Sequence, residues 1–566
     1  MELRLSAAEA AALRAALEEL RARDAVARLW KGDASLWSGA DEGRWLGWLR
    51  AVEGQRAEQA RWAALAGEVR RDGLRHALLL GMGGSSLCCE VLARTFGSAR
   101  GAPELLVVDS TVPAQVRAAE ARIDPARTLC FVSSKSGGTV ETDVLRRHFF
   151  ERIGRAVGPA RAASRFVAIT DPGSALARRA QEEGWRAVAL GVPETGGRFS
   201  ALSPFGMLPG AVMGLDVADL LARAQRMVEA CGPGAAPEEN PGVMLGALLG
   251  ALARRGRDKL TLVTSPALES LGAWLEQLVA ESTGKGGRGI VPVDGEGLAA
   301  ADAYGDDRLF AYVRLAAAPS AAQDAAVEAL AAAGQPVLRI DVAEAADLGA
   351  EFFRWEMATA VAGALLGLNP FDQPDVESAK AAARRLTAAY EETGELPASA
   401  PLLRAGPLEA HADAANAAAL DTADLAALVR SHLARLRPGD YFAVNAFLER
   451  VPAHARPLQT LRHAVRNARR VATSLGWGPR FLHSTGQLHK GGPNSGVFLE
   501  ITAADAEDLP IPGQRISFGV LKDAQASGDF QVLCERGRRA LRVHVAEGDV
   551  AAGLEELRAL VERGLA

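Results

Sequence analysis

The sequence predicts an α/β protein made of doubly wound parallel sheets, and three observations lead to this prediction. Short apolar runs alternate with helical stretches from residue 76 onward, as in parallel strands that helices cover on both faces. The same texture starts again near residue 259, after a loop rich in Gly and Pro at about residues 230–242. A third α/β segment runs from about residue 438 to the end. We therefore expect two tandem α/β domains followed by a C-terminal α/β segment.

Each predicted strand is a short apolar run that ends at a turn. In the first domain the predicted strands are His76–Leu80, Leu105–Val108, Cys130–Val132, Phe166–Ile169 and Arg186–Leu190. In the second domain they are Lys259–Thr264, Ile290–Val293, Leu309–Leu315 and Pro336–Ile340. In the C-terminal segment they are Tyr441–Phe447, Val497–Thr502 and Ala540–Val545, with helices at about 457–475, 520–536 and 548–563.

Helical patterns flank these domains. Ser6 and Glu9 form a capping box before an Ala- and Leu-rich period, so the first 70 residues are expected to be a helical arm. A helical stretch at about 350–390 closes the second domain, and residues 391–422 have the composition of a linker or an exposed helix. The predicted divisions are an arm at 1–70, domains at 71–235 and 236–390, a linker at 391–437 and a C-terminal α/β domain at 438–566.

The composition excludes several classes of function. The chain has 566 residues with 64 Lys+Arg against 69 Asp+Glu, so no basic surplus points to nucleic acid or an anionic membrane. Its five cysteines follow no metal-ligand spacing, and nothing else in the sequence indicates a metal or a cofactor. The N-terminus lacks the layout of a signal peptide, and the longest apolar runs, about a dozen residues, are shorter than a membrane span. We expect a soluble cytoplasmic protein.

Two polar turns follow predicted strands of the first domain. The first, Gly81–Ser86 (Gly-Met-Gly-Gly-Ser-Ser), either binds a ligand or is a tight packing turn, and it lacks the third glycine of a dinucleotide fingerprint. The second, Ser133–Thr139 (Ser-Ser-Lys-Ser-Gly-Gly-Thr), offers four hydroxyls, a lysine and two glycines before a helix. Such donors at the carboxyl end of a strand suit a phosphate monoester. Together the turns indicate a phosphorylated small molecule as ligand.

Four motifs, in this order and spacing, resemble those of glucose-6-phosphate isomerases. They are Gly81–Ser85, Ser134–Thr139, Gly196–Ser200 and Asn369–Lys380. The runs Ala27–Trp37 and Phe481–Asn494 further resemble the isomerase half of bifunctional transaldolase/glucose-6-phosphate isomerases. A transaldolase barrel would need roughly 250 residues of its own, so only the isomerase half is expected here.

The resemblance implies two tandem sugar-isomerase (SIS) domains, a homodimer, and an active site between the domains for a small-molecule sugar phosphate. It implies reversible isomerisation of glucose 6-phosphate and fructose 6-phosphate through an enediolate, without a cofactor or metal. The implied phosphate-binding residues are Ser85, Ser134, Lys135, Ser136, Thr139 and Gln373. The implied catalytic residues are Arg198, Glu296 and Lys380.

The chemistry of the reaction fits residues of these types. Glu296 lies in a Gly-flanked turn after a strand, where a carboxylate can reach a sugar and move a proton, and Asp294 is its rival. Arg198 follows two glycines and can face a developing enediolate. Lys380 lies seven residues after Gln373, which would put both on one face of a helix that begins near Pro374.

One part of the family pattern is missing. Family members commonly place a ring-opening histidine between the catalytic glutamate and the final helix, but this chain has none between Glu296 and Lys380. We hypothesise that the C-terminal segment folds back, within the chain or across a dimer, and supplies His489 (or His483) with Lys490. The alternative is that this run is a structural turn and that Lys380 alone opens the ring.

Two other functions compete with this interpretation. A non-catalytic sugar-phosphate-binding regulator would need the phosphate turn but not Arg198, Glu296 and Lys380 together. It would usually also carry a helix-turn-helix, and the first 70 residues contain no basic recognition helix. A dual glucose/mannose-phosphate isomerase is the second alternative.

Overall fold

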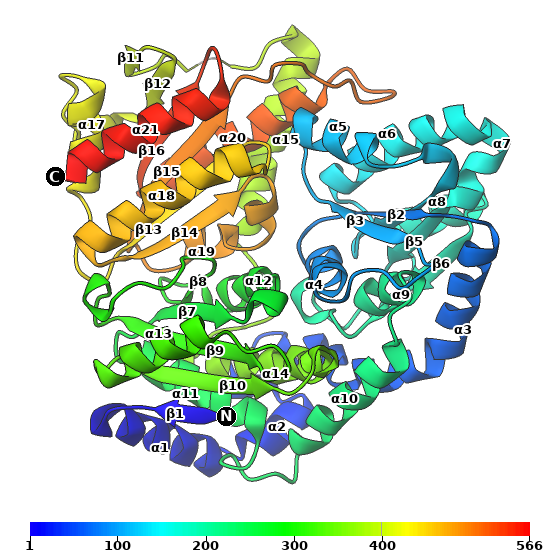
Figure 1. The fold of residues 1–566 in the computed structure, drawn as a ribbon, viewed down its shortest axis with the longest axis horizontal. Helices are drawn as coiled ribbons and strands as arrows, with labels where there is room; N and C mark the ends of the chain where they lie inside the picture. The colour runs from blue at the N-terminus through cyan, green and yellow to red at the C-terminus, as the bar shows by residue number, and fades with distance from the viewer. Residues whose placement is uncertain (398, 566) are drawn as a thin grey trace.

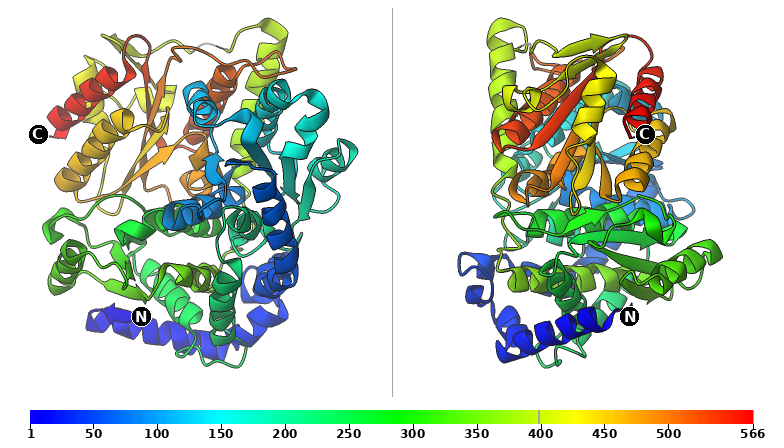
Figure 2. Two further views of the ribbon diagram at one scale, coloured as in Figure 1. Left: turned by 45° about the vertical axis from the view of Figure 1, so that its right-hand side comes forward. Right: turned by 90° about the vertical axis from the view of Figure 1, so that its left-hand side faces the viewer.

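A computed structural model of the chain describes residues 1–397 and 399–565 and contains three sheets (Figure 1). Each sheet is parallel in its central strands and carries helices on its faces (Figures 1 and 2). The predicted α/β class with parallel sheets is therefore confirmed. No helix among the described residues is both long enough and apolar enough to cross a bilayer.

The first sheet is fully parallel and has the strand order β3-β2-β4-β5-β6. Its strands are β2 (His76–Gly81), β3 (Glu104–Val108), β4 (Thr128–Ser133), β5 (Phe166–Thr170) and β6 (Ala187–Leu190). The chain winds outward from β2 to β3 and then returns to β4 on the other side of β2. This reversal puts a topological switch point between β2 and β4, where ligands bind in open α/β sheets.

The second sheet has the order β1-β10-β9-β7-β8. Its parallel strands are β7 (Lys259–Thr264), β8 (Val291–Val293), β9 (Arg308–Leu315) and β10 (Val337–Val342). The first strand, β1 (Glu2–Arg4), pairs antiparallel with β10, so the N-terminal arm is not only helical as predicted. Three residues are too few to display the alternation that marks a strand.

The N-terminal arm otherwise follows the prediction. Its helices are α1 (Ala7–Ala22), α2 (Ala25–Lys31) and α3 (Ala51–Arg71). Ser6 caps α1, and the reciprocal bond with Glu9 completes the capping box. The arm wraps along the outside of the first two sheets (Figures 1 and 2).

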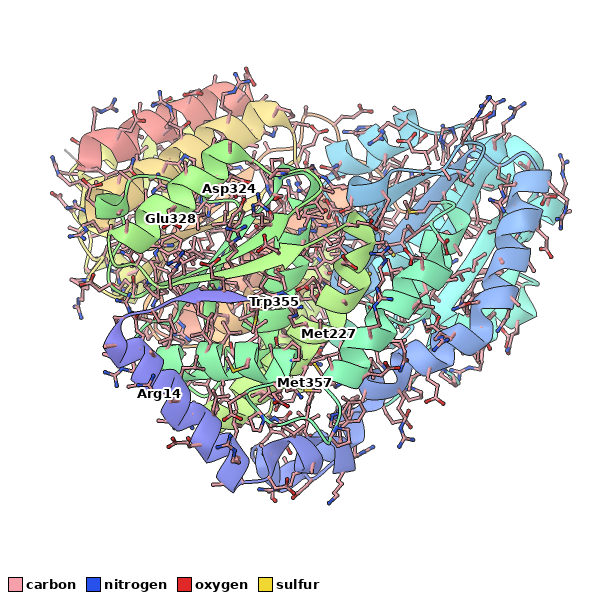
Figure 3. All side chains as sticks on the ribbon, turned by 60° about the horizontal axis from the view of Figure 1, so that its bottom comes forward. Arg14, Met227, Asp324, Glu328, Trp355 and Met357 are labelled. Carbon is pink, nitrogen blue, oxygen red and sulfur yellow. The ribbon has the colours of Figure 1, made fainter. Side chains whose placement is uncertain are left out.

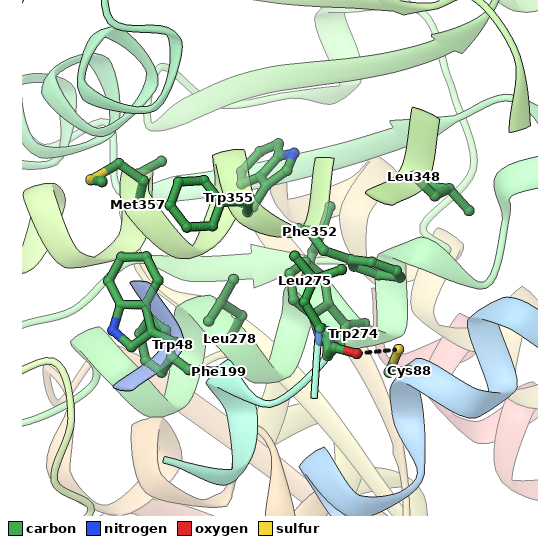
Figure 4. Close-up of a cluster of buried hydrophobic side chains, with 14 of the residues drawn as sticks. Trp48, Cys88, Phe199, Trp274, Leu275, Leu278, Leu348, Phe352, Trp355 and Met357 are labelled. Carbon is green, nitrogen blue, oxygen red and sulfur yellow. Dashed lines mark hydrogen bonds between the residues drawn. The ribbon is translucent and has the colours of Figure 1, made fainter. Parts of the chain in front are cut away.

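One large apolar core joins the first two sheets. It contains side chains from both sheets and from the helices between them, among which are Trp48, Trp274 and Trp355. Trp355 and Met357 belong to this core from α14 (Leu348–Leu366) (Figures 3 and 4), and Trp274 of α12 (Leu271–Thr283) packs edge-on against Phe352 of α14 (Figure 4). The two domains share this interior, which fixes the cleft between them.

Glu356 on α14, which is buried in this part of the protein, makes the stability of the fold depend on pH. Its side chain is 1% exposed, and neither carboxyl oxygen has a hydrogen-bond partner among the described residues. Burial raises its pKa well above the usual value, so the folded chain keeps a proton that the unfolded chain releases above pH 4.5. Stability therefore falls as the pH rises above 4.5, by up to about 1.4 kcal/mol per pH unit until the folded-state pKa is reached.

We expect Glu356→Gln, which cannot ionise, to lack this loss, so that its stability relative to the wild type increases as the pH rises above 4.5. Thermal unfolding midpoints of both proteins from about pH 5 to about pH 8 check this. Glu328→Gln is the control, because Glu328 is exposed on α13 (Ala321–Ala332; Figure 3). A gain that does not grow with pH would contradict the prediction.

The helical stretch predicted at about 350–390 is two helices. Gly367, with a φ of +67°, ends α14, and α15 (Val376–Thr393) begins after a turn at 368–375. Gly adopts this left-handed conformation without the strain that other residues would have. The turn carries the Asn369–Gln373 motif, and α15 packs against α20 (Phe518–Glu535) of the C-terminal part (Figure 1).

The third sheet belongs to the C-terminal part and has the order β11-β12-β16-β15-β13-β14. Its parallel strands are β13 (Tyr441–Phe447), β14 (Ala472–Trp477), β15 (Gly496–Ala503) and β16 (Arg539–Val545). The hairpin β11 (Leu403–Ala405) and β12 (Leu408–His411) adds to β16. One face is covered by α17 (Leu425–Leu433), α18 (Pro452–Arg469) and α21 (Val550–Leu565), and the other by α19 (Gly486–Gly491) and α20.

Two expectations for this part need correction. The helix predicted at about 457–475 ends at Arg469, and β14 follows it. Strand β14 starts with Ala-Thr-Ser and contains Gly476, so it lacks the apolar run that marked the other strands. The segment 391–437, predicted as a linker, contains β11, β12 and α17. Its Ala- and Pro-rich composition concealed these short elements.

Candidate active site

A cleft of about 660 Å³ opens at the carboxyl ends of β2 and β4. Side chains from the first domain, the second domain and the C-terminal part line it. The predicted site residues that line it are Ser85, Lys135, Ser136, Thr139, Arg198, Gln373 and Lys380. Ser134, Glu296 and His489 do not line it.

The first predicted turn both lines the cleft and packs tightly. It forms η4 (Gly83–Ser85), which lies against η7 (Gly197–Phe199). A Cβ on Gly84 would come within 2.0 Å of the Gly197 carbonyl oxygen, so only glycine permits this approach. The turn is therefore a tight packing turn, and this close backbone packing also brings Ser85 to the cleft.

The second turn presents Ser136 and Thr139 to the cleft. Ser134 is buried under the turn, with its Oγ 2.9 Å from Thr139 Oγ1, so it supports the turn rather than facing a ligand. The Lys135 ammonium bonds Asp171 and, at 3.2 Å, the Pro193 carbonyl oxygen. Burial raises the pKa of Asp171, and the Lys135 charge opposes that shift. The turn therefore holds its cation beside its hydroxyls at the cleft.

Arg198 is held rigidly at the floor of the cleft. Its side chain is 2% exposed, and burial lowers its pKa while Glu281 and a second carboxylate oppose that shift. Nε donates to Ser282 Oγ at 2.7 Å, and Nη2 donates to the Pro370 carbonyl oxygen at 2.7 Å. Nη1 lies 2.9 Å from Gln373 Oε1 and 3.2 Å from Glu281 Oε1. The guanidinium is thus a fixed cation at the cleft, held by these partners and by the Asp372 carbonyl oxygen at 2.9 Å.

The structure places Glu296 away from the cleft, which corrects the prediction for this residue. Glu296 is 2% exposed and accepts hydrogen bonds from Arg308 Nη1 and Nη2 at 3.0 and 3.1 Å. The Thr473 amide and hydroxyl bond the same carboxylate at 2.8 and 2.7 Å. Its rival Asp294 lines a separate cavity of about 150 Å³. Because Thr473 lies on β14, the Glu296 pair joins the second sheet to the third.

Glu281, which the sequence analysis missed, is the carboxylate beside Arg198 in the cleft. It lies in the last turn of α12, is 9% exposed, and accepts a hydrogen bond from Gln277 Nε2 at 3.0 Å. The other acidic residues on the cleft are Asp41, Asp171, Asp372 and Glu377, and each hydrogen-bonds another partner. The sequence signal that could have identified Glu281 is the Glu-Ser-Thr-Gly-Lys run from Glu281 to Lys285, which lies ahead of a strand.

Gln373 and Lys380 both line the cleft, but not from one helix face. Helix α15 begins at Val376, so Gln373 belongs to the preceding turn. The Gln373 side chain accepts from Arg198, whereas Lys380 Nζ lies 2.9 Å from Glu377 Oε1. Gln373 thus reaches the cleft from the turn, and Lys380 reaches it from the helix.

His489 and Lys490 lie inside the C-terminal part, not on the cleft. The His489 ring is 2% exposed and packs against Tyr441 and Phe498, and burial lowers its pKa well below the usual value. Lys490 pairs with the buried Asp529. His483, which we had named as the other choice, does line the cleft.

Comparison with known proteins shows the family of the chain. A family model described as phosphoglucose isomerase matches residues 54–298. The glucose-6-phosphate isomerase of Rubrobacter xylanophilus is 34% identical over 363 residues, which cover 56% of this chain and 83% of that protein. The glucose-6-phosphate isomerase of Enterococcus faecalis is 27% identical over 398 residues, which cover 62% of this chain and 88% of that protein.

Solved structures give the same fold. A hypothetical protein of Thermus thermophilus superposes with a TM-score of 0.58 at 28% identity, over 68% of this chain and all of that one. A glucose-6-phosphate isomerase of Chlamydia trachomatis superposes with a TM-score of 0.55 at 18% identity, over 67% of this chain and 86% of that one. The matched residues include both polar turns and the α12 carboxylate. The chain belongs to the glucose-6-phosphate isomerase family.

Proposed function

We propose that this chain interconverts glucose 6-phosphate and fructose 6-phosphate by proton transfer through an enediolate, without a cofactor. One observation supports this most strongly: a buried carboxylate, Glu281, lies 3.2 Å from a fixed guanidinium, Arg198, in a cleft beside a hydroxyl-rich turn. A base next to a fixed cation at a phosphate-binding cleft is the arrangement that aldose–ketose isomerisation needs.

In this proposal the substrate phosphate lies at the turn that carries Lys135, Ser136 and Thr139, with Ser85 opposite. Helix α6 (Val140–Val157) starts directly after this turn, so its first amides and its dipole also favour an anion. The sugar then extends over the cleft floor toward Arg198. Anchoring at the phosphate sets the distance from C1 and C2 to the carboxylate.

Glu281 then takes the proton from C2 of the open-chain aldose and returns it to C1. As the C2–H bond breaks, the electron pair forms the enediolate, and Arg198 steadies the charge on the oxygen. When the hydroxyl proton on O2 passes to O1 and C1 receives the proton from Glu281, the ketose results. The Gln277 hydrogen bond keeps Glu281 in place during both transfers.

Solvent exchange tests this proposal. During turnover in D₂O, the wild type should place deuterium at C1 of fructose 6-phosphate and C2 of glucose 6-phosphate, as seen by proton NMR. Binding of either sugar phosphate without turnover or exchange would instead indicate the regulator. A coupled assay that includes mannose 6-phosphate separates the dual isomerase from the glucose-specific enzyme.

Removing the Lys135 ammonium is expected to weaken phosphate binding. We expect Lys135→Met to raise KM for glucose 6-phosphate by about tenfold to a hundredfold while kcat changes less, because the charge acts on substrate and transition state alike. Steady-state kinetics at fixed ionic strength check this. Lys31→Met, on α2 in the N-terminal arm, is the control. A fall in kcat with unchanged KM would contradict this role.

We further propose that the chain corresponds to the isomerase half of bifunctional transaldolase/glucose-6-phosphate isomerases and acts as a cytoplasmic homodimer. The run Phe481–Asn494 supports the first part, and the resemblance to the family supports the second. Light scattering on the purified chain gives its mass in solution, and a transaldolase assay of the same sample tests for a second activity.

A further inference from the structure

The C-terminal part, residues 438–565, carries one histidine onto the cleft. His483 ends the short helix η11 (Arg480–His483), far in sequence from the phosphate turn. Its Nε2 lies 2.9 Å from Oε1 of Glu141, 342 residues earlier in the chain. Glu141 is in the first turn of α6, directly after the phosphate turn. The histidine therefore meets the first domain at the edge of the proposed substrate site.

Glu141 fixes the orientation of the His483 ring. Burial alone would raise the pKa of Glu141, but its contact with His483 holds it below the usual value, so Glu141 stays a carboxylate. A carboxylate can only accept, which assigns the proton to His483 Nε2. Among the described residues the ring makes this one hydrogen bond, so in the neutral ring Nδ1 keeps an unshared lone pair. Gln525 on α20 donates to the same Glu141 oxygen at 2.7 Å.

The His483 backbone is tied to the proposed proton-transfer group. Gln277 Nε2 donates to Glu281 Oε2 at 3.0 Å and to the His483 carbonyl oxygen at 2.8 Å. Gly83 packs against both partners: a Cβ there would lie 2.7 Å from Gln277 Nε2 and 2.8 Å from the His483 carbonyl oxygen. One amide thus sets the position of Glu281 relative to the histidine.

Further contacts anchor this segment to the first domain. Arg480, three residues before His483, bonds Asp109 at 2.7 Å and also pairs with Glu90. The loop at 504–517 reaches back over the first domain, where Ile511 and Ile516 join its apolar core. In Figure 1 this orange loop extends toward α5 (Pro113–Ala121) and α6. All of these contacts lie within one chain.

We propose that the C-terminal part is an integral wall of the active site and that His483, oriented by Glu141, opens the sugar ring in the same chain that carries Glu281. Each chain then holds a complete cleft and takes no residue from a second copy. The inference rests on the proposed isomerase function. Of the sequence-based alternatives, it favours His483 over His489. It also favours a histidine from the same chain over one from a dimer partner.

The ring-opening step balances with groups on the cleft. His483 Nδ1 accepts the proton of the C1 hydroxyl while the bond between C1 and the ring oxygen breaks. The ring oxygen takes a proton from the Lys380 ammonium, which also lines the cleft. The products are the open-chain aldehyde, an imidazolium and a neutral lysine, and one proton passing from His483 to Lys380 through solvent restores both. No oxidant or other reactant is needed.

The test combines His483→Gln with Glu281→Gln. Glutamine at 483 keeps an N–H donor for Glu141 but has no titrating base. Alone, His483→Gln should lower kcat on glucose 6-phosphate by at least about a hundredfold. It should still bind an acyclic hydroxamate mimic of the enediolate with nearly unchanged Kd, a readout that a loss of cleft structure would move. His454→Gln, in the same C-terminal part and bonded to the Glu449 carbonyl oxygen, is the control and should keep wild-type kinetics.

Co-expression of the two inactive variants then separates the two sources of the histidine. If the histidine came from a partner subunit, random pairing of the two variants would restore both groups in about a quarter of all sites. We expect no recovery, because each chain lacks one of its own groups. Recovery would overturn the inference, as would wild-type turnover by His483→Gln. A wild type without isomerase activity would instead overturn the proposed function, and the catalytic role of His483 with it.

Discussion

Glu281→Gln is expected to lower kcat for glucose 6-phosphate by about 10³- to 10⁴-fold, because the amide cannot carry the proton between C2 and C1. KM should change little, since Arg198 and the phosphate turn remain. Glutamine matches the shape of glutamate and can still accept a hydrogen bond from Gln277, so the cleft should persist. A coupled assay in both directions, with the thermal midpoint as a measure of folding, checks this prediction.

Glu296→Gln is the matched control for this experiment. Glu296 is the carboxylate that the sequence favoured, but it faces Arg308 and Thr473 in the interior. Its substitution should leave kcat per folded molecule near the wild-type value. If Glu296→Gln lost turnover while Glu281→Gln kept it, the assignment from the cleft would be wrong and the sequence-based one correct.

Glu296→Ala is expected to destabilise the fold by about 3–5 kcal/mol, the cost of leaving a buried charge without its partner. The substitution leaves the fully buried Arg308 without its carboxylate partner. It also removes the acceptor of two hydrogen bonds from Thr473. Because those bonds connect the second sheet to β14, the C-terminal part should loosen first. Hydrogen exchange of β14 amides and denaturant unfolding measure the two effects.

The ion pair between Glu296 and Arg308 predicts that the stability of the fold decreases at acidic pH. Burial alone would raise the pKa of Glu296, but Arg308 and the hydrogen bonds hold it below the usual 4.5. The stabilisation is therefore present above pH 4.5 and is lost as the pH falls through the folded-state pKa. Glu296→Ala should show a smaller loss of stability on acidification than the wild type. Glu328→Ala, on the exposed face of α13, should follow the wild-type curve, and equal acid sensitivity in all three would contradict this role.

The sequence alone predicted most strands of the three sheets and the positions of the two polar turns. Runs such as Phe166–Ile169 are buried on both faces, so their apolar character is visible without knowledge of their neighbours. The Ser133–Thr139 turn is likewise local, because strand, hydroxyl-rich turn and helix follow each other directly. Elements whose burial depends on distant contacts left weaker signals, as β1 and β14 illustrate.

The two acid–base groups required the tertiary structure. Glu296 and Glu281 both lie near Gly-rich turns beside β8, and only packing shows that one faces Arg308 and the other Arg198. Likewise His483 and His489 stand six residues apart in one polar run. The fold places His483 beside Glu141 and His489 among aromatic side chains of the interior. Sequence spacing cannot distinguish such neighbours.

The sequence by itself determined the α/β class, the family and the turns that suit a phosphate, because each depends on residues adjacent in the chain. The tertiary structure decided which carboxylate and which histidine line the cleft. Those choices depend on contacts such as His483 with Glu141, 342 residues apart. Burial and pairing, which assign a side chain to chemistry or to the core, arise only when distant segments pack together.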